Sequence, residues 1–220
     1  SKTTLDVTNT SYAQGGIAAV TDFTQDDFEK HIKDTHIAGA GLCDPDALRQ
    51  VITKAPEQIR TLLQWGAEFD KKADGNFDLH KEGGHSEFRI LHQLDNTGFE
   101  IQRALISQIK NHPNIDVYEN CFAIDIITQH HLGRNNEPWM TDIRCYGAYV
   151  LNEATGQVDT FLSKVTMMAT GGIGNVYSIT TNPTISTGDG IAMVFRAKGV
   201  IKSMEFVQFH PTSLYNPNER

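Results

Sequence analysis

The 220-residue sequence contains only three cysteines, no long apolar run and fewer basic than acidic residues. Cys43, Cys121 and Cys145 are an odd set without a short pairing, which predicts buried, reduced thiols in a reducing cytoplasm. No apolar run approaches the roughly 18 residues of a membrane helix, and the polar start Ser1–Thr4 predicts no signal peptide. The formal net charge of -8 argues against nonspecific binding to nucleic acid or acidic membranes. We therefore expect a cytoplasmic protein with neither nucleic acid nor membrane as a partner.

Several catalytic and metal-binding patterns are also missing. We find no Ser-His-Asp arrangement and no phosphate-binding lysine loop, and we expect no catalytic thiol. The string most similar to a Gly-x-Gly-x-x-Gly dinucleotide turn is Gly172–Tyr177, which lacks the third glycine. We also expect no metal site, because no metal-like spacing appears among the histidines, which include His31, His36, His92, His130 and His131.

Helical and strand-like segments alternate along the chain, which predicts an α/β fold. The length is sufficient for one large domain or two small ones. Apolar periodicity and capping residues predict helices over 26–36, from Asp44 onward, from Pro56 to Gly66, from Asn96 or Thr97 to about Asn111, and over 189–198. Strand-like runs lie at 115–118, 121–128, 143–151 and 160–168, with a turn at 152–156.

The segment Ser11–Val20 is the most informative stretch of the chain. Gly15 and Gly16 allow close approach of the backbone to a ligand, and Ile17–Val20 resembles the start of a buried helix. A turn of bare N–H groups at a helix start suits a phosphate or the edge of an electron-rich ring. A tight, packed turn is the structural alternative.

Two later segments add candidate contacts to the same ligand. Ser186–Met193 is a second turn of small residues, with Asp189 at the mouth of a helix. An N-cap role alone would explain Asp189. Thr170 and Gly171 end a predicted strand, at the sheet edge where open α/β sheets bind ligands. Close packing between helix and strand is the alternative for this pair.

Two further segments provide candidate substrate contacts. In Glu82–Ser86 the carboxylate precedes two glycines, so it can approach a ligand with little steric shielding, although a solvated surface glutamate is the alternative. Glu205–Thr212 is a strand-like run that places Gln208 and His210 on one face. For the histidine, a structural role between apolar neighbours is the alternative.

In their order and spacing, these motifs resemble the flavoprotein family of succinate dehydrogenase, fumarate reductase and L-aspartate oxidase. The resemblance runs from Thr8 to Leu214 and is closest to L-aspartate oxidase, through Ser11–Val20, Glu82–Ser86 and Ala169–Gly172. It implies an FAD-binding domain of the two-dinucleotide-binding-domain type over residues 1–203 and the start of a capping domain over 204–220. It also implies an internal fragment that lacks the first β-α-β unit and the later substrate-binding arginines, and that is inactive by itself.

The resemblance assigns roles to individual positions. Asn9 stands where relatives with covalent flavin have a histidine, which implies non-covalent FAD. Glu82 would hold the α-ammonium group of an amino acid, because the dicarboxylate reductases have a neutral amide there. His210 and Gln208 would contact a substrate carboxylate, with Thr212 on the same face. The implied cofactor contacts are Asn9, Thr10, Ser11, Tyr12, Ala13, Gln14, Gly15, Gly16, Thr170, Gly171 and Asp189.

The implied reaction is flavin-dependent oxidation of L-aspartate to iminoaspartate, with a hydride moving from Cα to flavin N5. Oxygen or fumarate would accept the electrons. The resemblance places this reaction at the first step of NAD biosynthesis, with quinolinate synthase as the next enzyme. A soluble fumarate reductase or related dicarboxylate oxidoreductase is one alternative, which Glu82 disfavours. A non-catalytic remnant is the other, and a flavin spectrum discriminates it from an enzyme.

Overall fold

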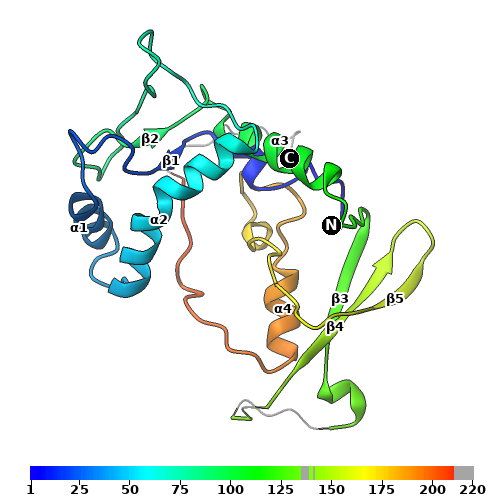
Figure 1. The fold of residues 1–220 in the computed structure, drawn as a ribbon. Helices are drawn as coiled ribbons and strands as arrows, with labels where there is room; N and C mark the ends of the chain where they lie inside the picture. Colours follow the sequence, from blue (N-terminus) through cyan, green and yellow to red (C-terminus); the bar gives the residue numbers. More distant parts are fainter. Residues whose placement is uncertain (135–138, 141, 211–220) are drawn as a thin grey trace. The chain divides into compact units, whose positions relative to one another are not determined.

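The computed structural model describes residues 1–134, 139–140 and 142–210. The chain divides into two compact units (Figure 1), and each is described by itself. One unit is Thr10–Ile115, and the other combines Ser1–Asn9 with Asp116–Arg220. In the part of the chain that is described, no helix has both the length and the apolar character needed to cross a membrane.

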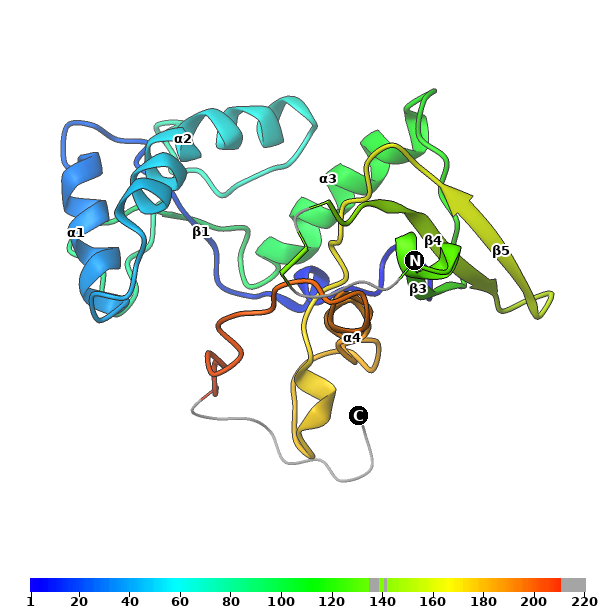
Figure 2. The same cartoon turned by 90° about the horizontal axis from the view of Figure 1, so that it is seen from below.

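The unit Thr10–Ile115 is mainly helical. A small core joins its helices to a two-stranded ribbon, in which β1 and β2 pair antiparallel with Ile17 opposite Leu91. Helices α1 and α2 pack side by side (Figure 2). Its elements are the 3-10 helix η1 (Thr10–Tyr12), β1 (Ile17–Ala18), α1 (Phe28–Ala38), α2 (Pro45–Gln64), β2 (Ile90–Leu91) and α3 (Thr97–Asn111). The core contains Ala19, Ile59, Ala67, Phe69, Leu91 and Ala104.

Side-chain caps explain where α1 and α2 begin. The Asp27 carboxylate accepts a hydrogen bond from the Lys30 backbone N–H at 2.8 Å. The Asp44 carboxylate accepts from two backbone N–H groups of the first turn of α2, at 3.0 Å each, and Pro45 follows it. Such caps satisfy donors that have no partner within a helix and typically stabilise it by about 1 kcal/mol. The predicted helix starts are confirmed within one or two residues.

Helix α2 continues through Pro56, so the separate helix predicted to start there is wrong. A proline inside a helix costs about 3 kcal/mol, because it removes a hydrogen bond and crowds the preceding turn. Ile52 and Ile59 lie on opposite sides of Pro56 along the helix, and both are buried. Each contributes roughly 1.5–3 kcal/mol of apolar burial, which together offsets the break. Val51, next to Ile52 in the sequence, points away from this core and is 68% exposed.

The segment Ile17–Val20 is not the helix start that its sequence suggested. Ile17 and Ala18 form β1, and the Ala19 N–H extends the pairing by donating to the Arg89 carbonyl at 2.9 Å. Ala19 and Val20 are completely buried. β-branched residues suit a pleated surface when a partner strand is available, and β2 provides that partner.

The other unit contains an antiparallel sheet of three strands in the order β3-β4-β5. Cys121 lies opposite Asn152 on the first pair, and Asn152 lies opposite Gln157 on the second. Helix α4 packs on β3, where Arg196 forms an ion pair with Asp125 at 3.1 Å. The elements are β3 (Cys121–Thr128), the 3-10 helix η2 (Gln129–Leu132), β4 (Cys145–Asn152), β5 (Gln157–Leu162), the 3-10 helix η3 (Gly174–Val176) and α4 (Asp189–Arg196). The predicted strand at 121–128 and the turn at 152–156 are confirmed.

Of two further predicted strands, one is absent and the other is shorter than expected. Residues 115–118 form no strand, and β5 ends at Leu162 instead of continuing to 168. Val165 and Met167 are accordingly 81% and 88% exposed. A segment becomes a strand only when a neighbour pairs with a run of its backbone groups. Here the Ser1 ammonium donates to the Tyr118 carbonyl at 2.7 Å and the Ser163 N–H donates to the Tyr146 carbonyl at 2.9 Å, but in the described residues these single bonds are not part of a strand. The three cysteines are free, as expected, but half-buried rather than buried.

Candidate cofactor and substrate site

The turn Gln14–Gly16 presents unsatisfied backbone donors at the surface. In the described part of the chain, none of the N–H groups of Gln14, Gly15 and Gly16 has a hydrogen-bond acceptor, and all three residues are exposed. The start of α3 holds the turn from the other side. The Thr97 hydroxyl donates to the Gly15 carbonyl at 2.9 Å, and the Gly98 N–H donates to the Ala13 carbonyl at 2.9 Å. The carbonyl groups are thus fixed while the donors stay available to a ligand.

Glycine occupies the two positions of this turn for different structural reasons. A Cβ on Gly16 would overlap with the Ile90 side chain and the Leu91 carbonyl, so close packing on β2 requires glycine there. Gly15 is open apart from Glu82, whose Oε1 lies 3.5 Å from the position that a Cβ would take. The packed-turn alternative therefore explains Gly16. Gly15 instead offers bare backbone directly beside the Glu82 carboxylate.

Glu82 begins a tight turn that depends on glycine. The His85 N–H donates to the Glu82 carbonyl at 3.2 Å, and Gly84 has a φ of +89°. Such a left-handed residue at the third position is typical of a type II turn and strongly favours glycine. The side chain of Glu82 is exposed. The structure thus brings Glu82, the predicted contact for the substrate, next to Gln14–Gly16, the predicted contact for the cofactor.

An ionic cluster around the buried Arg89 anchors this turn, and we call its members the Arg89 cluster: Arg89, Asp26, Asp34 and Ser86. Arg89 is completely buried and donates to both oxygens of Asp26, at 2.7 and 2.8 Å. It also donates to Asp34 Oδ2 at 2.6 Å. The same Asp34 oxygen accepts from the Ser86 N–H and hydroxyl, at 2.7 Å each. These charge-assisted bonds tie the Glu82–Ser86 segment to α1.

Hydrogen bonds control ionisation in the Arg89 cluster. Burial raises the pKa of Asp34, but the hydrogen bonds from Ser86 and Arg89 outweigh it and lower that pKa from 3.8 to about 2. Burial also opposes the charge of Arg89, yet its two carboxylate partners raise its pKa above the usual value. Burial and then the Arg89 charge lower the pKa of the neighbouring His31, which therefore stays neutral at pH 7.

Sequence reasoning missed the Arg89 cluster. Asp26 lies 63 positions from Arg89 and Asp34 lies 55, so no local pattern joins them. One signal was available, since Arg89 directly precedes the apolar Ile90 and Leu91. A charged side chain in such a run is almost never buried without an ionic partner.

In the other unit, three distant motifs meet at the start of α4. The Asn9 side-chain oxygen accepts from the Ser186 hydroxyl at 2.9 Å, and a Cβ on Gly171 would lie 3.8 Å from Asn9 Nδ2. The Gly188 N–H donates to the Gly172 carbonyl at 3.1 Å. The predicted cofactor contacts of this unit therefore gather in one place.

Asp189 is not the N-cap of α4, because Gly188 occupies that position and Asp189 is the first helical residue. Its carboxylate forms an ion pair with Lys2 at 2.6 Å and accepts from the Thr187 hydroxyl at 2.8 Å. Burial raises the pKa of Asp189, but the contacts with Lys2 and Thr187 outweigh it and lower the value. Lys2 was not predicted to take part. Thr170 packs on the first turn of the helix, where a Cβ on Gly190 would overlap with its hydroxyl, and this favours the packing alternative for Thr170.

Gln208 and His210 are exposed in a segment without regular secondary structure, so the strand predicted over 205–212 is wrong for its described residues, 205–210. The aromatic ring between them, Phe209, packs edge-on against Tyr177 with 5.6 Å between centroids. Thr212 lies outside the described residues. The roles of Gln208 and His210 stay predictions, as does the domain boundary at residue 204.

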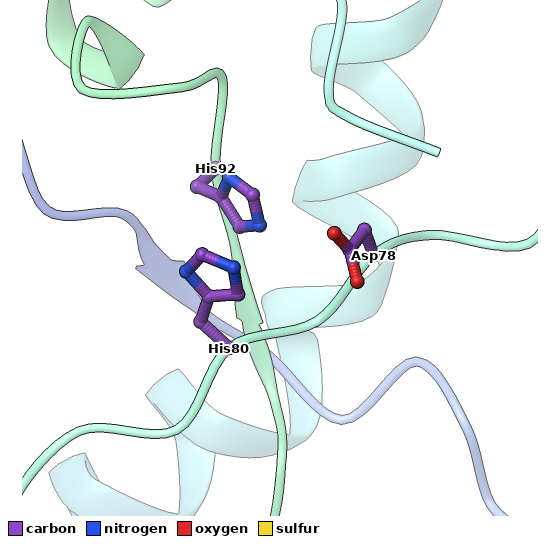
Figure 3. Close-up of side chains that lie close together, drawn as sticks. All are labelled: Asp78, His80 and His92. Atoms are coloured by element: carbon purple, nitrogen blue, oxygen red, sulfur yellow. The ribbon is translucent and has the colours of Figure 1, made fainter. Parts of the chain in front are cut away.

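Two histidines lie close to a carboxylate in space, although the spacing of the histidines in the sequence indicated no metal site. The ligand atoms of Asp78, His80 and His92 lie within 4.8 Å of one another, a separation at which they could hold a metal ion (Figure 3). His80 and His92 are twelve positions apart in sequence, so inspection of short spacings does not detect this cluster.

Comparisons with known proteins agree with the motif analysis. L-aspartate oxidase 2-b from Nicotiana tabacum is 50% identical over 206 residues, which cover 94% of this chain and 30% of the relative. L-aspartate oxidase from Yersinia pestis is 46% identical over 224 residues, covering 100% of this chain and 41% of the relative. The chain therefore spans about a third of the length of such curated relatives.

Solved structures confirm the expected fold class. A mutated FrdA chain of E. coli quinol fumarate reductase superposes with a TM-score of 0.80 at 29% identity, over 89% of this chain and 31% of the other. Sdh1 from Mycobacterium smegmatis gives a TM-score of 0.79 at 28% identity, over 90% and 33%. The family model described as an FAD binding domain matches residues 1–220. The chain therefore belongs to the FAD binding domain family that includes the flavoproteins of fumarate reductase and succinate dehydrogenase.

Proposed function

We propose that the protein is an FAD-dependent L-aspartate oxidase that converts L-aspartate to iminoaspartate, with oxygen or fumarate as acceptor. The observation that carries this proposal is the position of the Glu82 carboxylate beside the bare backbone of Gly15. The relatives named L-aspartate oxidase, at 45–50% identity, support the same conclusion. FAD is the cofactor of the family, and when bound it supplies the hydride acceptor.

The residues of this chain fit the flat, electron-rich edge of a flavin. The exposed N–H groups of Gln14, Gly15 and Gly16 are free donors, and no side chain shields them at the two glycines. Ring carbonyls and ring nitrogens are acceptors that such a turn satisfies well. We propose that the flavin is held non-covalently, because the Asn9 amide is not a nucleophile that could form a link to it. Asn9 is instead held in place by Ser186.

Glu82 distinguishes an amino acid from a dicarboxylate. Its exposed carboxylate would pair with the α-ammonium group of aspartate, whereas fumarate and succinate carry no cation. The resemblance also assigns to His210 and Gln208 hydrogen bonds to a substrate carboxylate. These groups would bind and orient the substrate.

The Arg89 cluster acts on the substrate through the turn that it anchors. Ser86 is fixed on α1 by two hydrogen bonds to Asp34, only four positions after Glu82. Placing a charged group before the substrate arrives lowers the entropy lost on binding. Arg89 and Asp34 are therefore positioning residues for Glu82 rather than catalytic residues.

Fumarate reduction is the second candidate, favoured by the superposition on fumarate reductase at a TM-score of 0.80. We further propose a place in NAD biosynthesis, with quinolinate synthase consuming the product, and a cytoplasmic location. The tobacco relative is named as a chloroplastic protein.

The direct test is turnover by the complete gene product, purified with its flavin. We expect oxidation of L-aspartate with trapped iminoaspartate as product and hydrogen peroxide formed in air, and little oxidation of succinate. Succinate oxidation exceeding that of aspartate would instead support the dicarboxylate oxidoreductase. Absence of turnover by the flavin-loaded protein with either compound would contradict both.

A further inference from the structure

Three potential metal ligands stand on a rigid backbone framework in the unit Thr10–Ile115. The His80 N–H donates to the Ile90 carbonyl at 2.9 Å, and the Ile90 N–H donates back at 3.1 Å. Asp70 joins the other two positions, since its N–H donates to the His92 carbonyl at 2.8 Å and its carbonyl accepts from the Asp78 N–H at 2.9 Å. These backbone bonds fix where the Asp78, His80 and His92 side chains begin.

The buried imidazole of His92 has unused capacity for a ligand. Its side chain is only 6% exposed, and neither ring nitrogen has a hydrogen bond of good geometry. Nδ1 nevertheless lies 3.1 Å from Asp70 Oδ2, a distance short enough for electrostatic contact. Histidines that bind metals typically direct their second nitrogen to a carboxylate, which sets the tautomer and raises ligand basicity. Asp70 lies where that carboxylate is needed, beside Nδ1 of His92, so that Nε2 of His92 is left to bind a metal.

The second imidazole lies parallel to the first. The His80 and His92 rings stack with 3.6 Å between centroids and 25° between planes. Figure 3 shows a nitrogen of each ring on the side that faces the Asp78 carboxylate. A buried imidazole nitrogen without a hydrogen bond, such as His92 Nε2, is costly, and a cation between these three groups would satisfy it. We propose that Asp78, His80 and His92 bind a divalent cation of the zinc type, with Asp70 orienting His92.

Ligand type and access select this class of metal. Two imidazoles and one carboxylate are typical of zinc sites that keep a fourth position for water. Bound zinc holds its ligand atoms about 2.0–2.2 Å away. The ligand atoms of Asp78, His80 and His92, which lie within 4.8 Å of one another, must therefore move closer together when the ion binds. The exposed His80 can rotate to do so, and it also gives the ion a path from solvent.

The position of the site gives it a consequence for the turn at Glu82. His80 precedes Glu82 by two residues. Asp78 directly follows the loop 71–77, whose ends are joined by the bridge between Lys71 and Phe77. A bound ion would connect the end of loop 71–77 to the residue that follows β2, and it would restrain the segment that leads into the Glu82 turn. This inference does not depend on the proposed flavin chemistry.

The test is metal binding by the 220-residue chain, freed of metal with a chelator and titrated with Co²⁺ as a spectroscopic probe for the zinc site. We expect one equivalent of Co²⁺ to give visible d–d absorption, which Zn²⁺ abolishes by competition. Because His80 and Asp78 are not buried, His80→Ala and Asp78→Asn should keep the fold, as circular dichroism can verify. Each should weaken Co²⁺ binding at least tenfold, and Asp70→Asn about 10-fold or more.

Two matched controls separate this site from other histidines. His36→Ala removes an exposed histidine of α1, and a variant with both His130 and His131 changed to alanine removes the adjacent pair after β3. Neither should change the absorption or the affinity. The proposal is wrong if the unmodified chain binds no Co²⁺, if His80→Ala binds it with unchanged affinity, or if only the His130 and His131 variant loses it.

Discussion

Asp34 should control the acid stability of the unit that contains the Glu82 turn. Its side chain is 12% exposed, and its pKa in the folded chain is about 2, lowered from 3.8. That difference of nearly two units corresponds to about 2 kcal/mol at 1.36 kcal/mol per unit. Because the folded pKa is depressed, this contribution is complete above about pH 4 and is lost as the pH falls towards 2.

Asp34→Asn removes the charge and keeps the size of the side chain. We expect unfolding free energy near pH 7 to fall by about 2 kcal/mol, because Arg89 keeps Asp26 but loses its second carboxylate. The variant should also lose much of the steep decline in stability between pH 4 and pH 2. Urea unfolding at a series of pH values measures both quantities.

Asp116→Asn is the matched control, since it removes an exposed carboxylate outside the Arg89 cluster. Its stability should follow the unmodified chain at every pH. If Asp34→Asn leaves both the free energy of unfolding and its acid dependence unchanged, the hydrogen bonds from Ser86 and Arg89 do not stabilise the ionised form, and the reasoning fails.

Two other results follow from the turn geometry and from Asn9. Gly84→Ala should destabilise the chain by about 1 kcal/mol, because the residue has a φ of +89°, while Gly83→Ala, in open space without a positive φ, should be nearly neutral; equal effects in urea unfolding would argue against the type II turn. Acid precipitation of the complete gene product should release all the flavin, because Asn9 cannot form a covalent link. Flavin that stays on the denatured polypeptide, detected by its fluorescence, would overturn the non-covalent assignment.

The sequence predicted the parts of the fold that depend on local chemistry. Asp44 and Pro45 mark the start of α2 because a carboxylate cap and a proline act within one helical turn. The strands predicted at 115–118 and 160–168 were absent or shorter in the structure, because strand formation requires a partner far away in sequence that a local pattern does not reveal. Ile17–Val20 failed for this reason too, because its partner β2 lies more than seventy positions later.

In the candidate site, too, the sequence predicted local features but not contacts between distant residues. Glu82 and Gly15 were each singled out from local motifs, but only the three-dimensional structure places them side by side. Arg89 and Lys2 were missed because their partners lie 55 or more positions away. Sequence motifs therefore indicated candidate ligand contacts. They did not indicate which residues hold those in place.

The central claim is that Glu82 recognises the ammonium group of an amino acid substrate. The most direct measurement is kcat/KM of Glu82→Gln for aspartate oxidation and for fumarate reduction, in the complete gene product with its flavin. Loss of one charge-assisted contact costs about 1.5–3 kcal/mol, so aspartate oxidation should fall roughly 10- to 100-fold. Fumarate reduction should change little, because fumarate has no cation and glutamine keeps the shape of the side chain.

Glu57→Gln is the control, because it changes an exposed glutamate of α2 that belongs to neither the Glu82 turn nor the Arg89 cluster. It should leave both reactions unaltered. Equal losses of the two activities in Glu82→Gln would show that Glu82 supports the fold or the flavin rather than the substrate. Unchanged activities would show that it is a solvated surface carboxylate, and either result would contradict the proposed recognition of aspartate.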